Sequence, residues 1–480
     1  MHENERPHRG GSTADEVLPV DRHSLRRAVW GSVVGTTLEQ FDLVIFGTAS
    51  SLVFSTLIFP KASPTLGVIA SFGVYGVGFL ARPFGGLFFS ALGERLGRKW
   101  VMMMTLFVMG TATACMGLLP TYAQAGILSP ILLVLLRLLQ GLGAGAEQSG
   151  GMTLLAETAP LGQRGRYASS VPVGSGLGIV LASAVWALID LLLTHQQVLD
   201  WGWRVVFLSS VFVTLTGFVV RRKLRESPVF TALRQQRTAA QDAPLRGLVT
   251  VGRKPLVSVA LIVIGQMTNA YVFLTFLGSY LLHHLDTDSG LVTRVLFAGA
   301  VAASIAPWLV GRLSDVIGRR PVGLVMTGIM VLFAPIAFLL LTTGSTFLTY
   351  VAVVIGSAVA VTGTNGLHSA FLPEIFGSRF RYAGTTMGRE IAAVLGGAFA
   401  PLIASSLLAW ASGSWWPIAV YMAAMAGISF VATLCTPETR DRDLLTEEDA
   451  FQERTRRAKQ NLSDTPPWPA HPSRQRPLQY

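Results

Sequence analysis

Long apolar segments alternate with short polar ones along most of the chain. Each apolar segment has about 20 residues or more, which is the length that an α-helix needs to cross a lipid bilayer. We place predicted spans at residues 28–57, 66–90, 100–119, 128–156, 168–193, 203–221, 256–283, 291–313, 321–342, 346–372, 383–409 and 414–435. These twelve spans predict an all-α, polytopic membrane protein with both chain ends on one side of the membrane.

The composition supports this fold class. Of the 480 residues, 51% are hydrophobic and 14% are charged, and the mean hydropathy is +0.51, which excludes an ordinary soluble domain. The alternating ten-residue segments of a membrane β-barrel are absent. Residues 1–27 are polar, so we expect no cleavable signal peptide. Cys115 and Cys435 lie in distant apolar segments, and we expect no disulfide.

The net charge of +11 is distributed in a way that argues against nucleic-acid binding. Basic residues gather in the two tails and in alternate polar segments, whereas the intervening segments carry few, namely Lys61 and, near helix ends, Arg204 and Arg294. The positive-inside rule then predicts that both termini are cytoplasmic. We also expect the protein to lie in the plasma (inner) membrane.

Two polar segments repeat one another. Residues 90–99 read SALGERLGRK and residues 311–320 read GRLSDVIGRR. A second pair, RGRY at 164–167 and RFRY at 379–382, recurs at nearly the same spacing. The chain is therefore predicted to contain two six-helix halves, 28–221 and 256–436, joined by a basic cytoplasmic linker, 222–255, and flanked by tails 1–27 and 437–480.

The repeated segment carries an acid, Glu94 in the first copy and Asp315 in the second. An acid at a helix end that faces basic residues and the N-terminus of another helix can hold two halves together. Simple anchoring by positive charge does not account for the acid and the paired glycines. We predict a cytoplasmic gate formed by Glu94, Arg95, Arg98, Asp315, Arg319 and Arg320, together with Arg389 and Glu390 in span eleven, which we expect to form a local pair or gate.

Acidic and basic residues also occur inside the predicted spans. Glu39 and Asp42 are three residues apart and share one helical face. Carboxylates at this depth are costly unless they are paired or line a wet cavity, so they mark either a functional site or a structural salt bridge. Arg82 and Glu147 fall at a similar depth, and such a cluster can retain one titratable proton. We predict proton coupling by Glu39, Asp42 and Glu147, and substrate binding by Gln40, Arg82, Arg137, Gln148, Tyr271 and Thr275.

The segment 311–320 resembles the loop signature of the major facilitator superfamily, G-x-L-x-D-R-x-G-R-[RK], except at Val316. Over residues 25–445 the chain is similar to the metabolite:proton symporter family within it. The motifs are EQFD (39–42), FLARPFGG (79–86), RLLQGLGAGAE (137–147), WGWR (201–204), ESPVF (226–230), PEIF (373–376) and PETR (437–440). The chain departs from the family at Gln40 and Gln148, where Trp is usual, and at Arg389 and Glu390.

This resemblance implies a proton-coupled transporter that imports a small polar metabolite by alternating access. The family's substrates include citrate, 2-oxoglutarate, shikimate, and proline or betaine, and we favour an organic acid. A proton-antiport exporter is an alternative, but the Gly-Pro-x-x-Gly-Gly motif of exporters is absent from span five, which reads VPVGSGLG at 171–178. A non-transporting sensor is a second alternative, although neither tail shows a catalytic or DNA-binding domain.

Catalytic motifs are absent from the sequence: there is no phosphate-binding Gly-Lys-Ser/Thr loop, no HExxH, no Cys/His metal spacing and no GxSxG. We therefore expect no enzyme activity and no cofactor, with the proton gradient as the energy source. The expected partners are a small-molecule substrate, protons and membrane lipid, and the expected functional unit is a monomer. In the tail, Thr446 to Asp449 are a predicted helix start.

Overall fold

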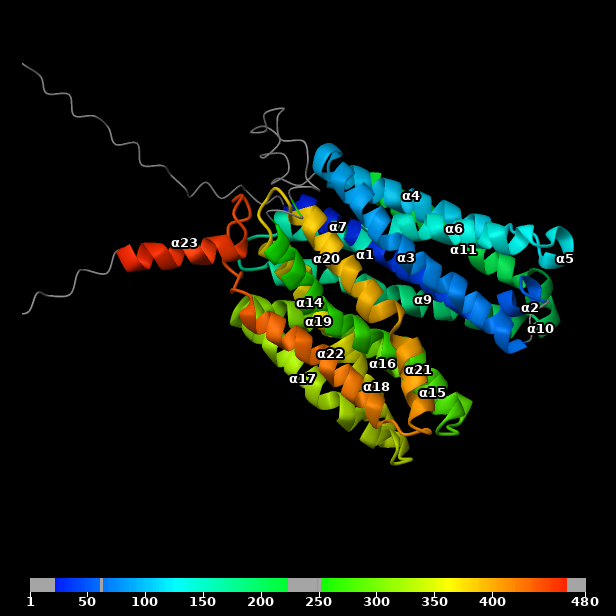
Figure 1. The fold of residues 1–480 in the computed structure, drawn as a ribbon. Coiled ribbons are helices and arrows are strands. Elements are labelled where there is room, and N and C mark those ends of the chain that lie inside the picture. Colours follow the sequence, from blue (N-terminus) through cyan, green and yellow to red (C-terminus); the bar gives the residue numbers. More distant parts are fainter. Residues whose placement is uncertain (1–21, 61–63, 223–247, 249–251, 464–480) are drawn as a thin grey trace, which may run out of the picture.

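The computed structural model describes residues 22–60, 64–222, 248 and 252–463. These residues form helices and irregular segments and contain no strand. Figure 1 shows two helical bundles, one built from the first half of the chain and the other from the second half. The all-α prediction with two bundles is confirmed.

The first bundle follows the predicted order of spans. Its elements are α1 (Arg22–Ala49) continued by η1 (Ser50–Phe54) and α2 (Ser55–Leu57), α3 (Pro64–Leu96), α4 (Arg98–Gly117), α5 (Tyr122–Ala125), α6 (Leu128–Ala144), α7 (Glu147–Thr158), α8 (Arg164–Ala168), α9 (Ser170–Leu192), α10 (His195–Gln197), η2 (Val198–Gly202) and α11 (Trp203–Arg222). Aromatic residues at one end of the bundle form its core, where Phe54 packs edge-on against Trp203.

The second bundle repeats this arrangement. Its elements are α14 (Arg253–Tyr271), η3 (Val272–Phe276), α15 (Leu277–His283), α16 (Ser289–Ile317), α17 (Arg319–Leu341), α18 (Thr346–Gly356), η4 (Ser357–Gly363), α19 (Thr364–Ile375), α20 (Arg381–Ala392), η5 (Ala393–Ala398), α21 (Ala400–Trp410) and α22 (Trp416–Cys435). Its core includes Phe276, Tyr280 and Phe338. The π-helical segments η1 to η5 were not predicted.

Ten helical segments in the described part of the chain are long and apolar enough to cross a membrane. Two further long segments, α1 to α2 and α3, precede them. Together they match the twelve predicted spans, and most boundaries agree within a few residues. The chain is therefore a multi-pass membrane protein.

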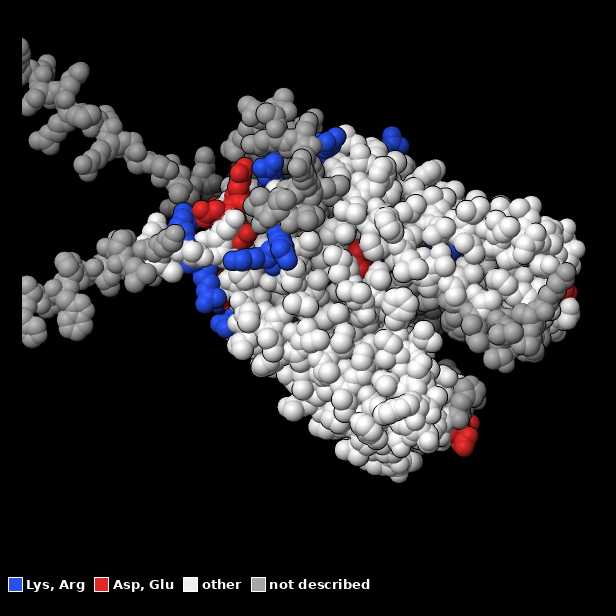
Figure 2. All heavy atoms as spheres, in the orientation of Figure 1, with Lys and Arg blue, Asp and Glu red and all other residues white. Residues whose placement is uncertain are grey.

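The two bundles meet at one end and part at the other. They converge where α1 begins and α22 ends, which we call the terminal end, and Figure 1 shows them spread apart at the opposite, far end. Figure 2 shows a hollow between the bundles that opens at the far end, and Lys and Arg gathered at the terminal end. The structure is thus closed at the terminal end and open at the far end.

Glycines bring the helices of the first bundle into backbone contact around the buried charges. A Cβ on Gly141 would stand 2.2 Å from the carbonyl oxygen of Gly78, and one on Gly145 would stand 2.0 Å from that of Arg82. No side chain fits in either gap. This close approach fixes α3 against α6 and against the junction between α6 and α7.

Helix α11 extends to Arg222, one residue beyond predicted span six, and Arg221 is fully buried in its last turn. In the tail, the helix α23 (Ala450–Ser463) begins later than predicted, because the Asp449 carboxylate accepts hydrogen bonds from the backbone N–H groups of Phe451 and Gln452 and caps it. The rest of the predicted linker, 223–247 and 249–251, lies outside the described residues.

Candidate functional site

A small pocket lies inside the first bundle. It is lined by Glu39, Asp42, Leu43, Gly78, Phe79, Arg82, Met109, Arg137, Gln140, Gly141 and Ala144, from α1, α3, α4 and α6. Its free space is about that of one water molecule. Four of the predicted site residues, Glu39, Asp42, Arg82 and Arg137, therefore line one cavity.

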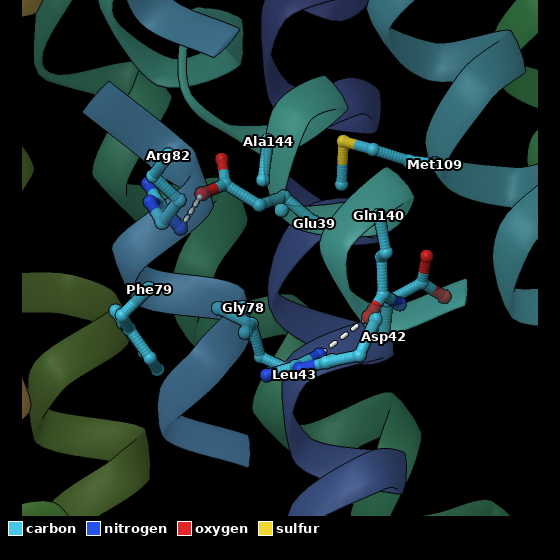
Figure 3. A pocket seen from close by; sticks show the side chains of 11 residues that line it. Glu39, Asp42, Leu43, Gly78, Phe79, Arg82, Met109, Gln140 and Ala144 are labelled. Carbon is cyan, nitrogen blue, oxygen red and sulfur yellow. Dashed lines mark hydrogen bonds and ion pairs between the residues drawn. The ribbon is translucent and has the colours of Figure 1, made fainter. Parts of the chain in front are cut away.

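Arg82 holds two carboxylates, one from each half of the chain. Its Nη1 lies 2.9 Å from Glu39 Oε1, and Figure 3 shows the two side chains pointing toward one another. Its Nε and Nη2 donate to Glu390 Oε2 at 3.0 Å and Oε1 at 3.3 Å. All three residues are buried. Glu39 Oε2 has no hydrogen-bond partner within the described residues.

Asp42 belongs to a second, neighbouring network. Its Oδ2 accepts from Thr113 Oγ1 at 2.7 Å, and Thr113 Oγ1 accepts in turn from Gln140 Nε2 at 2.6 Å. Arg137 donates to Gln140 Oε1, which links the arginine to Asp42 through neutral side chains. Asp42 Oδ1 and Arg137 Nε have no hydrogen-bond partner in the described part of the chain.

The Arg137 guanidinium lies between aromatic rings. Its Cζ is 4.3 Å from the centroid of the Phe46 ring and 4.8 Å from that of Tyr75. Nη2 also approaches the Tyr75 carbonyl oxygen at 3.4 Å. Cation–π contact therefore stabilises the positive charge of Arg137, which no carboxylate of the described residues contacts directly.

Glu147 does not join the Glu39–Arg82 cluster directly. It forms a buried ion pair with Arg221, and Thr105 Oγ1 donates to its Oε2 at 2.8 Å. Arg221 is not among the predicted site residues, because it follows the last apolar residues of span six and precedes further basic residues. The expectation of one cluster with all three acids is corrected: Glu39, Asp42 and Glu147 each belong to a different, neighbouring network.

Arg389 and Glu390 do not pair with one another, which corrects the expectation of a local pair. Glu390 reaches Arg82 in the first half, whereas Arg389 donates to Asn365 Oδ1 at 2.9 Å and to Gln148 Oε1. Gln148 belongs to the first half, so both residues of span eleven bind across the interface between the halves.

The remaining predicted substrate residues are more dispersed. Tyr271 contacts Phe79 of the other half edge-on, with ring centroids 5.5 Å apart. Gln40 is partly buried, and Gly178 of α9 packs beside its Cβ. Thr275 is exposed in η3 and does not line the pocket.

At the terminal end, Asp315 of α16 binds the first turn of α8 in the other half. Its carboxylate accepts from the backbone N–H groups of Gly165 at 2.8 Å and Arg166 at 2.7 Å. Arg319 Nη1 donates to the same carboxylate at 2.8 Å, and Arg319 Nε donates to Glu374 Oε2 at 3.0 Å. The acid thus lies at a helix N-terminus, where the helix dipole favours negative charge.

Arg381 and Arg164, which are not among the predicted gate residues, also form contacts at the terminal end. Arg381 binds Glu157 of the first half at 3.1 Å, and Arg164 Nη1 donates to the carbonyl oxygen of Arg442 at 2.7 Å. Arg320 donates to the Leu434 carbonyl at 2.6 Å, within its own half. Arg95 is exposed. The side chains of Glu94 and Arg98 lie outside those that the structure describes.

The segment after α22 folds back onto the terminal end. Arg442 is buried and binds Glu453 of α23 at 2.8 Å. Burial raises the pKa of the Glu453 carboxyl, but its hydrogen bond and ion pair with Arg442, with a further contribution from Arg457, outweigh burial and hold that pKa below its usual range. The docked tail therefore contains an ionised carboxylate at neutral pH.

The described residues contain no group of three or more His, Cys, Asp or Glu side chains arranged to hold a metal ion. The chemistry that the site supports with its own residues is the binding and release of protons and of anions, because it combines buried carboxylates with buried guanidinium groups.

Known proteins with similar sequences are transporters. A family model described as Major Facilitator Superfamily matches residues 34–389. In Escherichia coli K12, the chain is 36% identical to a putative transporter, YdfJ, over 86% of this chain and 97% of that protein. It is 33% identical to the shikimate transporter, over 86% and 95%. A proline/betaine transporter of Salmonella typhimurium LT2 is 31% identical, over 90% and 87%.

The fold also matches solved structures. The proton:xylose symporter XylE bound to 6-bromo-6-deoxy-D-glucose superposes with a TM-score of 0.71, covering 90% of this chain and 99% of that one. The sequence identity is 17%. At this identity, the similarity concerns the fold alone.

Proposed function

The chain belongs to the major facilitator superfamily and is a membrane transporter of metabolites, and we propose that it imports a small organic acid together with protons. One observation supports the proposal of proton coupling. Glu39 and Asp42 are both buried and line one pocket, and each has a carboxylate oxygen without a hydrogen-bond partner among the described residues. Buried carboxyl groups with a free oxygen can take up a proton when they lose a nearby positive charge.

Alternating access follows from the arrangement of the halves. We propose that the bundles within 28–221 and 256–436 rock around the central charges, so that the site faces one side of the membrane at a time. The gathering of Lys and Arg at the terminal end supports a cytoplasmic position for both tails. The state described here then faces away from the cytoplasm, and Asp315 with Arg319 forms part of its cytoplasmic gate. We propose a monomer as the transporting unit.

The free donor groups favour a carboxylate substrate. Arg137 lines the pocket. Among the described residues, no carboxylate is in direct contact with it, and its Nε has no hydrogen-bond partner. A planar guanidinium binds carboxylates through paired N–H groups. A quaternary ammonium such as betaine needs open aromatic faces, but here Arg137 covers the rings of Phe46 and Tyr75.

The test is uptake of a labelled metabolite panel into proteoliposomes under an imposed inward proton gradient. The panel contains carboxylates such as shikimate, citrate and 2-oxoglutarate, together with proline and betaine. We expect accumulation of at least one carboxylate and its dissipation by a protonophore. Uptake of betaine but of no carboxylate contradicts the substrate class. Efflux in exchange for protons, without gradient-driven accumulation, supports the exporter instead.

A further inference from the structure

Arg82 connects the proton site of the first half to a carboxylate of the second half. One edge of its guanidinium binds Glu39 at 2.9 Å, and the other binds both oxygens of Glu390. Glu39 lies in α1 and Arg82 in α3, whereas Glu390 lies in α20. This contact therefore exists only while α20 lies against α3, as it does in the structure with the terminal end closed.

A single guanidinium cannot fully compensate two buried carboxylates. While Glu390 occupies one edge of Arg82, Glu39 has only a share in the positive charge, and burial then favours its neutral, protonated form. When the terminal end opens, α20 moves away from α3 and takes Glu390 with it. Arg82 then pairs with Glu39 only, and the ionised form of the Glu39 carboxyl group is favoured.

Other charges near Glu39 do not cancel this effect. Glu147 is paired with Arg221, and Asp42 is hydrogen-bonded to Thr113 in the network of Arg137. These five residues are all in the first half and stay with Glu39 when the halves move. Arg389 moves with Glu390, but it binds the amides of Gln148 and Asn365, whereas Glu390 touches the same guanidinium as Glu39.

We propose that Glu390 is the positioning residue that makes protonation of Glu39 depend on which end of the transporter is open. In the closed state of the terminal end, a proton from far-side water binds Glu39, and Oε2 is the oxygen with no hydrogen-bond partner in the described residues. When the terminal end opens, the proton leaves to water on that side, and Arg82 remains charged throughout. This inference rests on the proposed proton coupling and changes the role of Glu390 from a gate to a part of the coupling.

The test compares the wild-type protein with Glu390→Gln in proteoliposomes, using the carboxylate that the uptake panel identifies. Two quantities are measured: exchange of labelled for unlabelled substrate as a function of pH, and accumulation under an inward gradient of one pH unit. One proton per substrate supports an accumulation ratio of about tenfold. In Glu390→Gln we expect exchange to persist, its pH midpoint to move to lower pH, and the accumulation ratio to fall toward one.

Asp315→Asn is the matched control for a merely structural role. It also removes a contact between the halves at the terminal end, but its partners are Gly165, Arg166 and Arg319 and not Arg82. We expect it to change the rate of exchange while the accumulation ratio stays at the wild-type value, because the Glu39–Arg82–Glu390 contact is intact. If Glu390 only clamps the halves, the two variants change the same quantities. Equal behaviour of the two variants therefore overturns the inference.

The remaining outcomes separate this inference from the proposed function. A wild-type protein that does not respond to the proton gradient overturns both. A coupled wild-type protein together with a Glu390→Gln variant of unchanged pH midpoint and accumulation ratio overturns this inference alone. Glu390→Met, which also lacks the carboxylate, replaces Glu390→Gln in the same assay if the glutamine variant is not monodisperse.

Discussion

Gly165 and Gly311 bring the two halves of the transporter into backbone contact. A Cβ on Gly165 would stand 2.2 Å from the carbonyl oxygen of Gly311, and a Cβ on Gly311 would stand 2.5 Å from that of Gly165. Gly165 lies in the first turn of α8 and Gly311 in α16. The halves can approach this closely only because neither position carries a side chain, and the approach lets Asp315 reach the N-terminus of α8.

The first prediction concerns this contact. Gly311→Val places a branched side chain against Ser169 and the Gly165 carbonyl, so the terminal end cannot close fully. We expect faster labelling of cysteines introduced on the terminal side of the interface, and slower transport. Gly427→Val is the control, because a Cβ at this helical glycine meets nothing within 4 Å. Labelling of Gly311→Val at the wild-type rate would contradict the prediction.

The second prediction concerns the acid at the gate. Asp315→Asn keeps the shape of the side chain but removes its negative charge. The carboxylate that is lost accepts hydrogen bonds from Gly165, Arg166 and Arg319. Hydrogen bonds to charged groups contribute about 1.5–3 kcal/mol each, so the population should shift toward states open at the terminal end. We expect turnover to fall more than substrate affinity, with greater labelling of terminal-side cysteines.

A matched acid in the same region serves as its control. Glu438 accepts from the backbone N–H groups of Arg319 and Arg320, but these contacts lie within the second half. Glu438→Gln should therefore leave the labelling of the interface unchanged. Equal labelling of the two variants indicates that Asp315 does not hold the halves together.

The sequence predicts those features that depend on local pattern. The spans follow from the length of apolar segments, and the buried acids Glu39 and Asp42 follow from their position in the middle of one. The repeat also picks out Asp315 as a contact between helices. The spans and the two acids require only the spacing of residues within one segment, Asp315 requires the comparison of two similar segments, and the fold confirms the spans.

The contacts across segments cannot be predicted in this way. Arg221 has the same sequence surroundings as the exposed Arg222, and only the packing of α11 against α1 and α4 buries it beside Glu147. Likewise, nothing in span eleven indicates that Glu390 faces α3 rather than its own bundle. Such pairing depends on the rotation of each helix and on the state of the transporter, and the hydrophobic pattern of one chain records neither.

The third prediction distinguishes a structural role of Glu147 from proton coupling. Glu147→Gln leaves the fully buried Arg221 without its counter-ion, which typically costs about 3–5 kcal/mol. We expect a lower thermal unfolding temperature in detergent, with a smaller loss in the double variant Glu147→Leu/Arg221→Leu, which removes both charges. A stable Glu147→Gln protein that loses proton-driven accumulation would instead assign the coupling to Glu147.

The last prediction is that Glu39→Gln abolishes proton-driven accumulation while substrate exchange persists at least in part. Glutamine keeps the shape of the side chain and a hydrogen-bond acceptor for Arg82 but cannot bind or release the proton. An inward gradient of one pH unit supplies about 1.4 kcal/mol, or about a tenfold concentration ratio, and this ratio should fall to one in the variant.

A monocarboxylate that enters with one proton is electroneutral, so its accumulation should not change when the membrane potential is clamped. A zwitterion that enters with one proton gains about 2.3 kcal/mol per 100 mV. Asp42→Asn is assayed in parallel, because Asp42 lines the same pocket. If both variants still accumulate substrate in response to the proton gradient, the coupling site lies elsewhere in the protein.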